Sequence, residues 1–146
     1  MGGFLSQGIL NEIKAMDFMD QVDNPNNRFQ GLHHQFLASA LAVKMAHEID
    51  PNNMIGCMIC GITFYPGTCD PQDIMANRHM WEKSIFYCGD VQCKGKYPTF
   101  AKRLWNEHHV QLDITEQDLE DLRNGCVDMY TFSYYTVSYT HLRAHE

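Results

Sequence analysis

The sequence predicts an α/β fold in which two parallel strands are joined by helices. Two segments, Met54–Pro66 and Val127–Tyr135, are rich in apolar and aromatic residues, and the chain between them carries several helix start and stop signals. Another helical segment precedes the first strand, so the order is helix, strand, helices, strand. Such a crossover is right-handed in nearly all known proteins.

Composition is that of one globular domain. The chain has 146 residues, 45% of them apolar, which is enough for a packed core. The net charge is -7 and the 11 Lys and Arg residues form no basic run, which argues against nucleic-acid binding. No apolar stretch approaches the roughly 20 residues of a membrane span, and no secretion signal opens the chain. We therefore predict a cytoplasmic protein whose six cysteines are reduced thiols.

The first predicted helix runs from Phe29 to Ile49. Its apolar residues recur at steps of three and four, as on one face of a helix. They are Phe29, Leu32, Phe36, Ala40 and Val43. Asp50–Pro51 should end this helix. Before it, residues 1–25 resemble a loop, and Asp23–Pro25 is expected to form a turn.

The first predicted strand, Met54–Pro66, is apolar almost without alternation, as expected for a parallel strand covered on both faces. It contains Cys57 and Cys60, a spacing that suggests zinc or redox chemistry. On a strand, however, positions three apart point to opposite faces. We therefore expect two buried thiols that pack as small apolar groups, and no metal site.

Three helices are predicted between the strands. Asp70 supplies an N-cap before Pro71, which opens a helix to about Tyr87. Tyr97–Thr99 opens a second helix, which runs through Trp105.

Thr115 and Asp118 resemble a capping box that starts this third helix, and Asn124–Gly125 should end it. In the strand that follows, alternation predicts two faces. One carries Met129, Thr131, Ser133 and Tyr135, and the other carries Tyr130, Phe132 and Tyr134.

A series of short motifs extends in order over roughly residues 2–135. The motifs are His33–Phe36, Ala38–Lys44, Ile55–Met58, Tyr65–Pro66, Thr68–Pro71, Gly89–Val91, Tyr97–Pro98 and Phe132–Tyr135. Together they resemble glycoside hydrolase family 1, and within it the bacterial 6-phospho-β-glucosidases. The resemblance implies a partial TIM (β/α)8 barrel, from the loop after strand four through strand six. Such barrels need about 250 residues.

The resemblance also implies a reaction, the retaining hydrolysis of 6-phospho-β-D-glucosides. That reaction requires two carboxyl groups about 5 Å apart. Neither family position has a match in this chain, so we expect the isolated chain to be inactive. Asn11–Glu12 has the letters of the acid/base segment, but no apolar strand precedes it, and an exposed loop glutamate is the better interpretation. No cofactor is implied, and the sequence leaves a homo-oligomeric parent open.

Two tyrosines are candidate site residues. Tyr135 matches the family tyrosine whose hydroxyl supports the nucleophilic carboxylate, and it stands at the end of the second strand. Tyr65 ends the first strand at the same rim, where it could shape the aglycone side of the site. A simply packed rim tyrosine is an equal alternative for Tyr65.

Residues 1–136 are thus expected to form a partial glycosidase barrel domain. From Val137 the resemblance stops, and residues 137–146 are expected to be a non-native tail. For that reason the i, i+4 pair His141 and His145 is not proposed as a metal site. The alternatives left open are a plain β-glucosidase fragment, a non-catalytic module that binds sugars or proteins, and a metal or thiol-redox protein.

Overall fold

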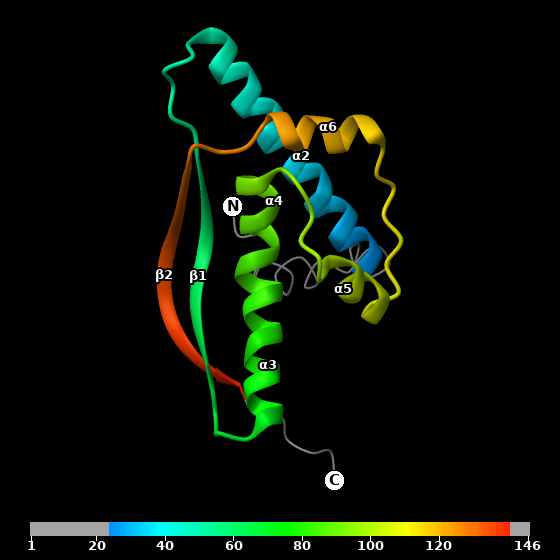
Figure 1. Ribbon diagram of the computed structural model, residues 1–146, viewed down its shortest axis with the longest axis vertical. Coiled ribbons are helices and arrows are strands. Elements are labelled where there is room, and N and C mark those ends of the chain that lie inside the picture. Colours follow the sequence, from blue (N-terminus) through cyan, green and yellow to red (C-terminus); the bar gives the residue numbers. More distant parts are fainter. Residues whose placement is uncertain (1–23, 141–146) are drawn as a thin grey trace, which may run out of the picture.

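The structure, a computed structural model, describes residues 24–140 and the side chains of residues 24–134. Two parallel strands lie side by side, a helical rod runs beside them, and three further helices pack beyond the rod (Figure 1). This arrangement confirms the predicted α/β class. In chain order the elements are α2 (Pro25–Ile49), β1 (Gly56–Pro66), α3 (Pro71–Trp81), the π-helix η1 (Glu82–Phe86), α4 (Tyr87–Lys94), α5 (Ala101–Glu107), α6 (Glu116–Asn124) and β2 (Met129–Thr140).

Helix α2 begins four residues earlier than predicted. The side chain of Asn24 accepts a hydrogen bond from the backbone N–H of Asn27 at 2.9 Å, and Pro25 occupies the first turn. The expected turn at this point was therefore wrong, because its Asn and Pro serve as N-cap and first helical residue. The helix ends at Ile49 as predicted, and the predicted apolar face is buried.

Helix α3 begins after the Asp70 cap, as predicted, but the rod that it opens is longer than expected. The rod continues through Tyr87 to Lys94 and ends at Gly95, which adopts a left-handed φ of 62°. Between its two α-helical parts, the π-helix Glu82–Phe86 widens one turn. A π-turn accommodates an extra residue, so it breaks the periodicity by which the whole rod could have been predicted.

The shorter helices follow their boundary signals. Helix α5 ends at Glu107, two residues beyond the predicted Trp105. Thr115 and Asp118 form the predicted capping box at the start of α6, with both reciprocal hydrogen bonds present. Asn124 is the last residue of α6, as expected.

The two strands pair in parallel, from Gly56 opposite Met129 onwards. The register is regular as far as Gly61 opposite Tyr134, and then it shifts, so that the next pair skips Tyr135. The pairing continues to the end of β2, across the expected domain boundary between residues 136 and 137. That boundary itself stays a prediction.

The hydrophobic core lies between the rod and the helices α2, α5 and α6 (Figure 1). Tyr87, Cys88 and Val91 are its most buried members from the rod, at 1%, 0% and 1% exposure. The indole N–H of Trp105 donates to the Tyr87 hydroxyl at 3.0 Å, which satisfies a buried polar group. The sheet is therefore a flank of the molecule and not its centre.

Candidate active-site rim

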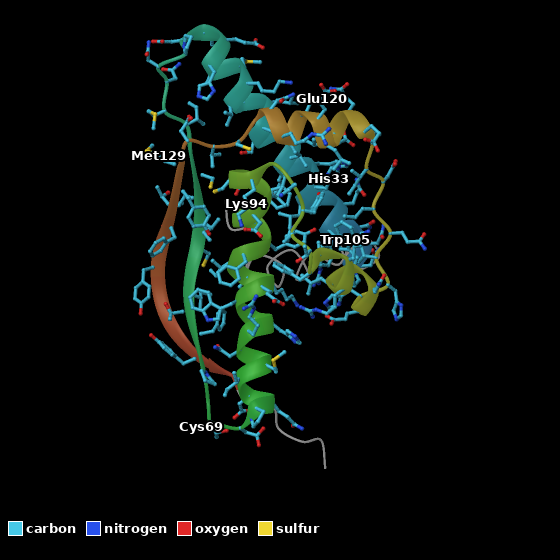
Figure 2. The ribbon with its side chains drawn as sticks, viewed as in Figure 1. His33, Cys69, Lys94, Trp105, Glu120 and Met129 are labelled. Atoms are coloured by element: carbon cyan, nitrogen blue, oxygen red, sulfur yellow. The ribbon has the colours of Figure 1, made fainter. Side chains whose placement is uncertain are left out.

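The carboxyl ends of β1 and β2 and the loop after β1 form the rim on which the predicted site residues should lie. In barrels and other parallel sheets, functional residues gather at this end of the strands. Cys69 marks the loop after β1, at the end of the sheet far from Met129 (Figure 2).

A short polar network fixes the loop. The Thr68 hydroxyl donates to the Asp73 carboxylate at 2.6 Å, and the Asp70 N–H donates to the Thr68 oxygen at 3.1 Å. The Asp70 side chain in turn accepts from the N–H of Gln72 at 2.8 Å, which caps α3. Asp73 is 6% exposed. The network joins strand end, loop and helix start in one rigid corner.

Trp81 holds the other side of this corner. Its indole N–H donates to the carbonyl oxygen of Phe64 at 2.9 Å, and its ring meets the Phe64 ring edge-on at 6.2 Å. It also stacks on Phe86 at 5.7 Å. Sequence reasoning missed Trp81, because nothing in its spacing relates it to a residue 17 positions earlier.

The two candidate tyrosines lie on neighbouring strands. Tyr65 is 51% exposed and stands one residue before the end of β1. The backbone of Tyr135 lies in β2 at the register shift, opposite the step from Gly61 to Ile62. Its side chain is outside the described set, so the predicted role of Tyr135 stays a prediction. Irregularities of this kind are common next to active sites, where they re-aim a side chain.

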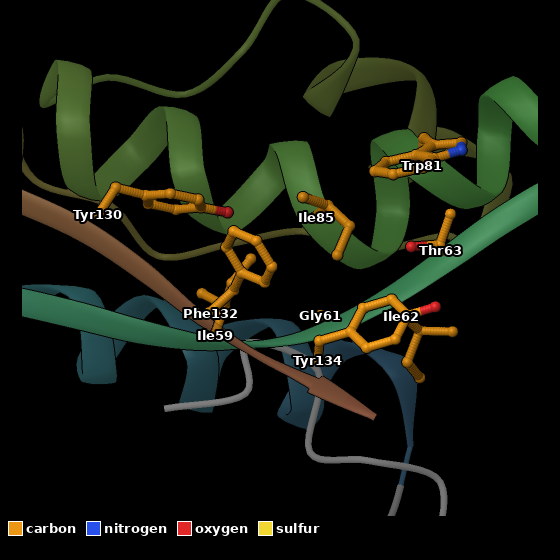
Figure 3. A pocket seen from close by; sticks show the side chains of 9 residues that line it. All are labelled: Ile59, Gly61, Ile62, Thr63, Trp81, Ile85, Tyr130, Phe132 and Tyr134. Atoms are coloured by element: carbon orange, nitrogen blue, oxygen red, sulfur yellow. The ribbon is translucent and has the colours of Figure 1, made fainter. Parts of the chain in front are cut away.

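A cavity of about 200 Å³ lies between the sheet and the rod (Figure 3). It is lined by Ile59, Gly61, Ile62, Thr63, Trp81, Ile85, Tyr130, Phe132 and Tyr134. Among the residues that the structure describes, this lining contains no carboxyl group. Burial raises the pKa of Tyr130 to about 12, so this phenol stays neutral at physiological pH.

Cys57 and Cys60 on β1 differ in how far they are buried. Cys57 is buried, and desolvation raises the pKa of its thiol, whereas Cys60 is half-buried. Neither is part of a disulfide. Within residues 24–140, no group of three or more His, Cys, Asp and Glu side chains is placed to hold a metal ion.

His33 is buried on α2, at 1% exposure (Figure 2). Its Nδ1 lies 2.7 Å from the Tyr97 hydroxyl, and its Nε2 lies 3.4 Å from the Asp118 carboxylate. Burial lowers the pKa of His33, partly offset by Asp118. This histidine therefore packs between α2 and α6 and does not face the rim.

Two predictions fall outside the described residues. They concern Asn11–Glu12, His141 and His145. Among the helices that the structure does describe, none has both the length and the apolar character needed to cross a membrane.

Parallel strands, a covering helical rod and a polar corner at the carboxyl ends of the strands are the local architecture of an α/β protein built from strand–helix–strand units. Residues 13–146 match glycosyl hydrolase family 1. The chain belongs to this family.

Similar proteins come from several bacteria. The chain is 44% identical over 118 residues to "Aryl-phospho-beta-D-glucosidase BglH" of Bacillus subtilis, with 81% of this chain and 25% of the relative covered. It is 44% identical over 110 residues to a "6-phospho-beta-glucosidase" of Clostridium longisporum, with 75% of this chain and 23% of the relative covered. The chain thus spans about a quarter of the length of these relatives.

Solved structures show the same fold. A family 1 β-glucosidase from Exiguobacterium antarcticum superposes with a TM-score of 0.72 at 22% identity, over 84% of this chain and 28% of that one. A family 1 glycoside hydrolase from Thermotoga maritima superposes with a TM-score of 0.62, over 77% of this chain and 25% of that one. The chain is a partial TIM barrel, as predicted.

Proposed function

We propose that this chain is part of a retaining glycosidase that hydrolyses 6-phospho-β-D-glucosides in the cytoplasm. The observation that supports it most is the ranking of relatives by identity. Identity is 43–44% to proteins named for phosphorylated glucosides, from Bacillus subtilis, Clostridium longisporum and Escherichia coli. It is 27% to "Beta-glucosidase A" of Acetivibrio thermocellus. The phospho-glucoside branch is therefore preferred over the plain β-glucosidase.

The proposed mechanism needs an acid/base carboxyl group and a nucleophilic carboxylate about 5 Å apart. We assign both to segments of the parent enzyme that this chain does not contain. This chain would supply one wall of the site. In that wall the Tyr135 hydroxyl would donate to the nucleophile and stabilise its charged form, and Tyr65 would border the aglycone.

The same proposal divides the chain at residue 136. Residues 1–136 would be barrel, and residues 137–146 would be a non-native tail. The parent enzyme needs no cofactor in this mechanism, because two carboxyl groups carry both chemical steps.

A chromogenic assay tests the proposal. The purified chain, given p-nitrophenyl 6-phospho-β-D-glucoside, should release no nitrophenol above the buffer rate, since each positioned acid or base group contributes about 10²–10⁴-fold. The full-length parent enzyme, given the same compound, should hydrolyse it. It should hydrolyse the unphosphorylated p-nitrophenyl β-D-glucoside at least 100-fold less efficiently.

Two results would count against the proposal. Turnover by the isolated chain would show that the catalytic carboxylates lie within these 146 residues. Equal efficiency of the parent enzyme on the two substrates would favour the plain β-glucosidase instead.

A further inference from the structure

Two cysteines from different elements meet at the amino end of the sheet. Cys57 is the second residue of β1, and Cys93 lies one residue before the end of α4. A hydrogen bond joins their thiols. Cys57 is buried and Cys93 is exposed, so the pair has one inner and one outer member. The thiol partner of Cys57 therefore comes from the rod and not from its own strand.

Backbone hydrogen bonds hold the two elements together at this point. The N–H of Val127 donates to the carbonyl oxygen of Gln92 at 3.0 Å. The N–H of the next residue, Asp128, donates to the carbonyl oxygen of Ile55 at 2.8 Å. Two consecutive residues thus bind the end of α4 and the approach to β1. The backbone therefore brings the two thiols together.

A surface hollow of about 250 Å³ gives access to Cys93. Cys93 lines this hollow together with Tyr130 of β2 and residues of the rod. A Cβ on Gly89 would come within 3.1 Å of the Tyr130 ring, so the ring packs closely on the rod beside the hollow. Cys57 is 6% exposed. A reagent in solution therefore reaches Cys93 first, and reaches Cys57 through it.

Two further thiols lie near this pair. Cys126 is close enough to Cys93 to act on its charge, but its thiol donates to the carbonyl oxygens of Leu122 and Arg123, at 3.8 and 3.6 Å. Cys88 is close to Cys57 in the same way, but it is 0% exposed and out of reach of solvent. The pair that is both accessible and joined by a hydrogen bond is Cys57 with Cys93.

Burial makes both thiols of the pair weak acids. Desolvation raises the pKa of Cys57 and that of Cys93, so little of either is thiolate at neutral pH. A first reaction with a reagent is therefore slow. A second reaction, between two sulfurs that are already neighbours, is favoured because it is intramolecular.

We propose that Cys57 and Cys93 form a reversible disulfide when the chain meets a small-molecule disulfide, and that this bond cross-links the end of the rod to the start of β1. The Cys93 thiolate attacks one sulfur of the small disulfide and releases the other half as a thiolate. The Cys57 sulfur then attacks Cys93, forms the new S–S bond and expels the second half. Two protein thiols are oxidised, one small disulfide is reduced, and the two protons end on the two small thiols released.

The bond would lie at the end of the sheet opposite the rim. Cys69, in the loop after β1, and Lys94, next to Cys93, lie at opposite ends of the rod (Figure 2). In barrels the carboxyl ends of the strands carry the function, whereas their amino ends contribute to stability. The cross-link is therefore expected to stabilise the chain without altering the polar corner at the rim.

The test uses the chain of 146 residues, reduced and then incubated with oxidised glutathione at mildly alkaline pH. The remaining thiols are blocked with N-ethylmaleimide, and tandem mass spectrometry of proteolytic fragments identifies the cysteines that are joined. The expected product is a bond between Cys57 and Cys93. It should raise the Tm by about 5–10 °C, and dithiothreitol should reverse this rise.

Three variants separate the two steps. Cys57→Ala should leave glutathione attached to Cys93, because the thiol that displaces it is gone. Cys93→Ser should show no oxidative rise in Tm, and as an exposed position it keeps the proposal testable where Cys57→Ala fails to fold. Cys69→Ser is the matched control, since Cys69 is also exposed but lies at the far end of the rod. It should form the bond like the unchanged chain.

Three outcomes would overturn the proposal. The first is glutathione that stays on Cys93 of the unchanged chain while Cys57 remains reduced. The second is a bond from Cys93 to Cys126 as the main product. The third is the same set of disulfides in urea as in native buffer, which would show that the fold does not select the pair.

Discussion

His33 illustrates how much one buried residue is constrained by its neighbours. Backbone hydrogen bonding from Thr115 lowers the pKa of Asp118, so its carboxylate is ionised and can only accept hydrogen bonds. The Nε2 of His33 must therefore carry the proton, and Nδ1 accepts from the Tyr97 hydroxyl. Neutral His33 thus satisfies both neighbours and joins α2 to α6.

This arrangement makes stability depend on pH. Since the pKa of folded His33 lies below its ordinary value of about 6.5, the unfolded chain binds the proton more readily. Stability is therefore complete above pH 6.5 and is lost as the pH falls toward the folded pKa. Asp113 and His34 also face the ring and act in opposite directions.

We predict that His33→Gln costs about 1–3 kcal/mol at pH 7.5, because buried partners lose a hydrogen bond. The variant should also lose less stability than the unchanged chain between pH 7.5 and pH 5.5. Urea unfolding at the two pH values measures both effects. His47→Gln, at a histidine one-third exposed, is the control. If the stability of His33→Gln and of the unchanged chain fell equally between pH 7.5 and pH 5.5, protonation of His33 would not be the cause.

At the scale of elements, helix boundaries were the most predictable feature. The caps Asp70 and Thr115 and the ends at Ile49 and Asn124 follow from local chemistry, and each lies where the sequence predicts it. The π-turn within the rod and the register shift at Tyr135 could not be predicted, because each is an extra residue accommodated by packing against other elements.

Gly95 and Gly31 offer a matched test of what a glycine does in a helix. Gly95 ends α4 with a positive φ, and a Cβ there would lie 2.6 Å from Arg123 Cα. Gly31 lies inside α2 with open space around it. Gly95→Ala should destabilise by about 2 kcal/mol, and Gly31→Ala should stabilise by about 0.5–1 kcal/mol. Thermal unfolding followed by circular dichroism compares them, and the same sign for both would refute this account.

At the scale of the whole molecule, the family could be predicted from ordered motifs, but the candidate site could be predicted only in part. Tyr65 stands one residue before the end of β1, at the carboxyl end of that strand, and its role beside the aglycone stays a prediction. The clamp between Trp81 and Phe64 was not foreseen, since it depends on how the rod lies over the sheet. A helix cap can be predicted because it depends on a few neighbouring residues. A barrel site is harder to predict, because its residues come from the ends of several strands.

The proposed role of Tyr135 can be tested only in the parent enzyme. Tyr135→Phe there should lower kcat about 10²-fold with little change in KM, because the lost hydrogen bond would stabilise charge at the nucleophile. Steady-state kinetics with a 6-phospho-β-glucoside measures this. Tyr134→Phe, at a residue that lines the cavity between the sheet and the rod, should leave kcat unchanged. A similar kcat in the two variants would remove Tyr135 from the mechanism.

The widened turn Glu82–Phe86 has a consequence for how this chain can vary in length. This turn fixes the directions in which two side chains leave the rod. Trp81 points toward Phe64 at the end of β1, and Tyr87 points into the hydrophobic core. Deleting one residue here would rotate one half of the rod by about 100° against the other. Insertions and deletions are therefore tolerated less well at this point than in the loops.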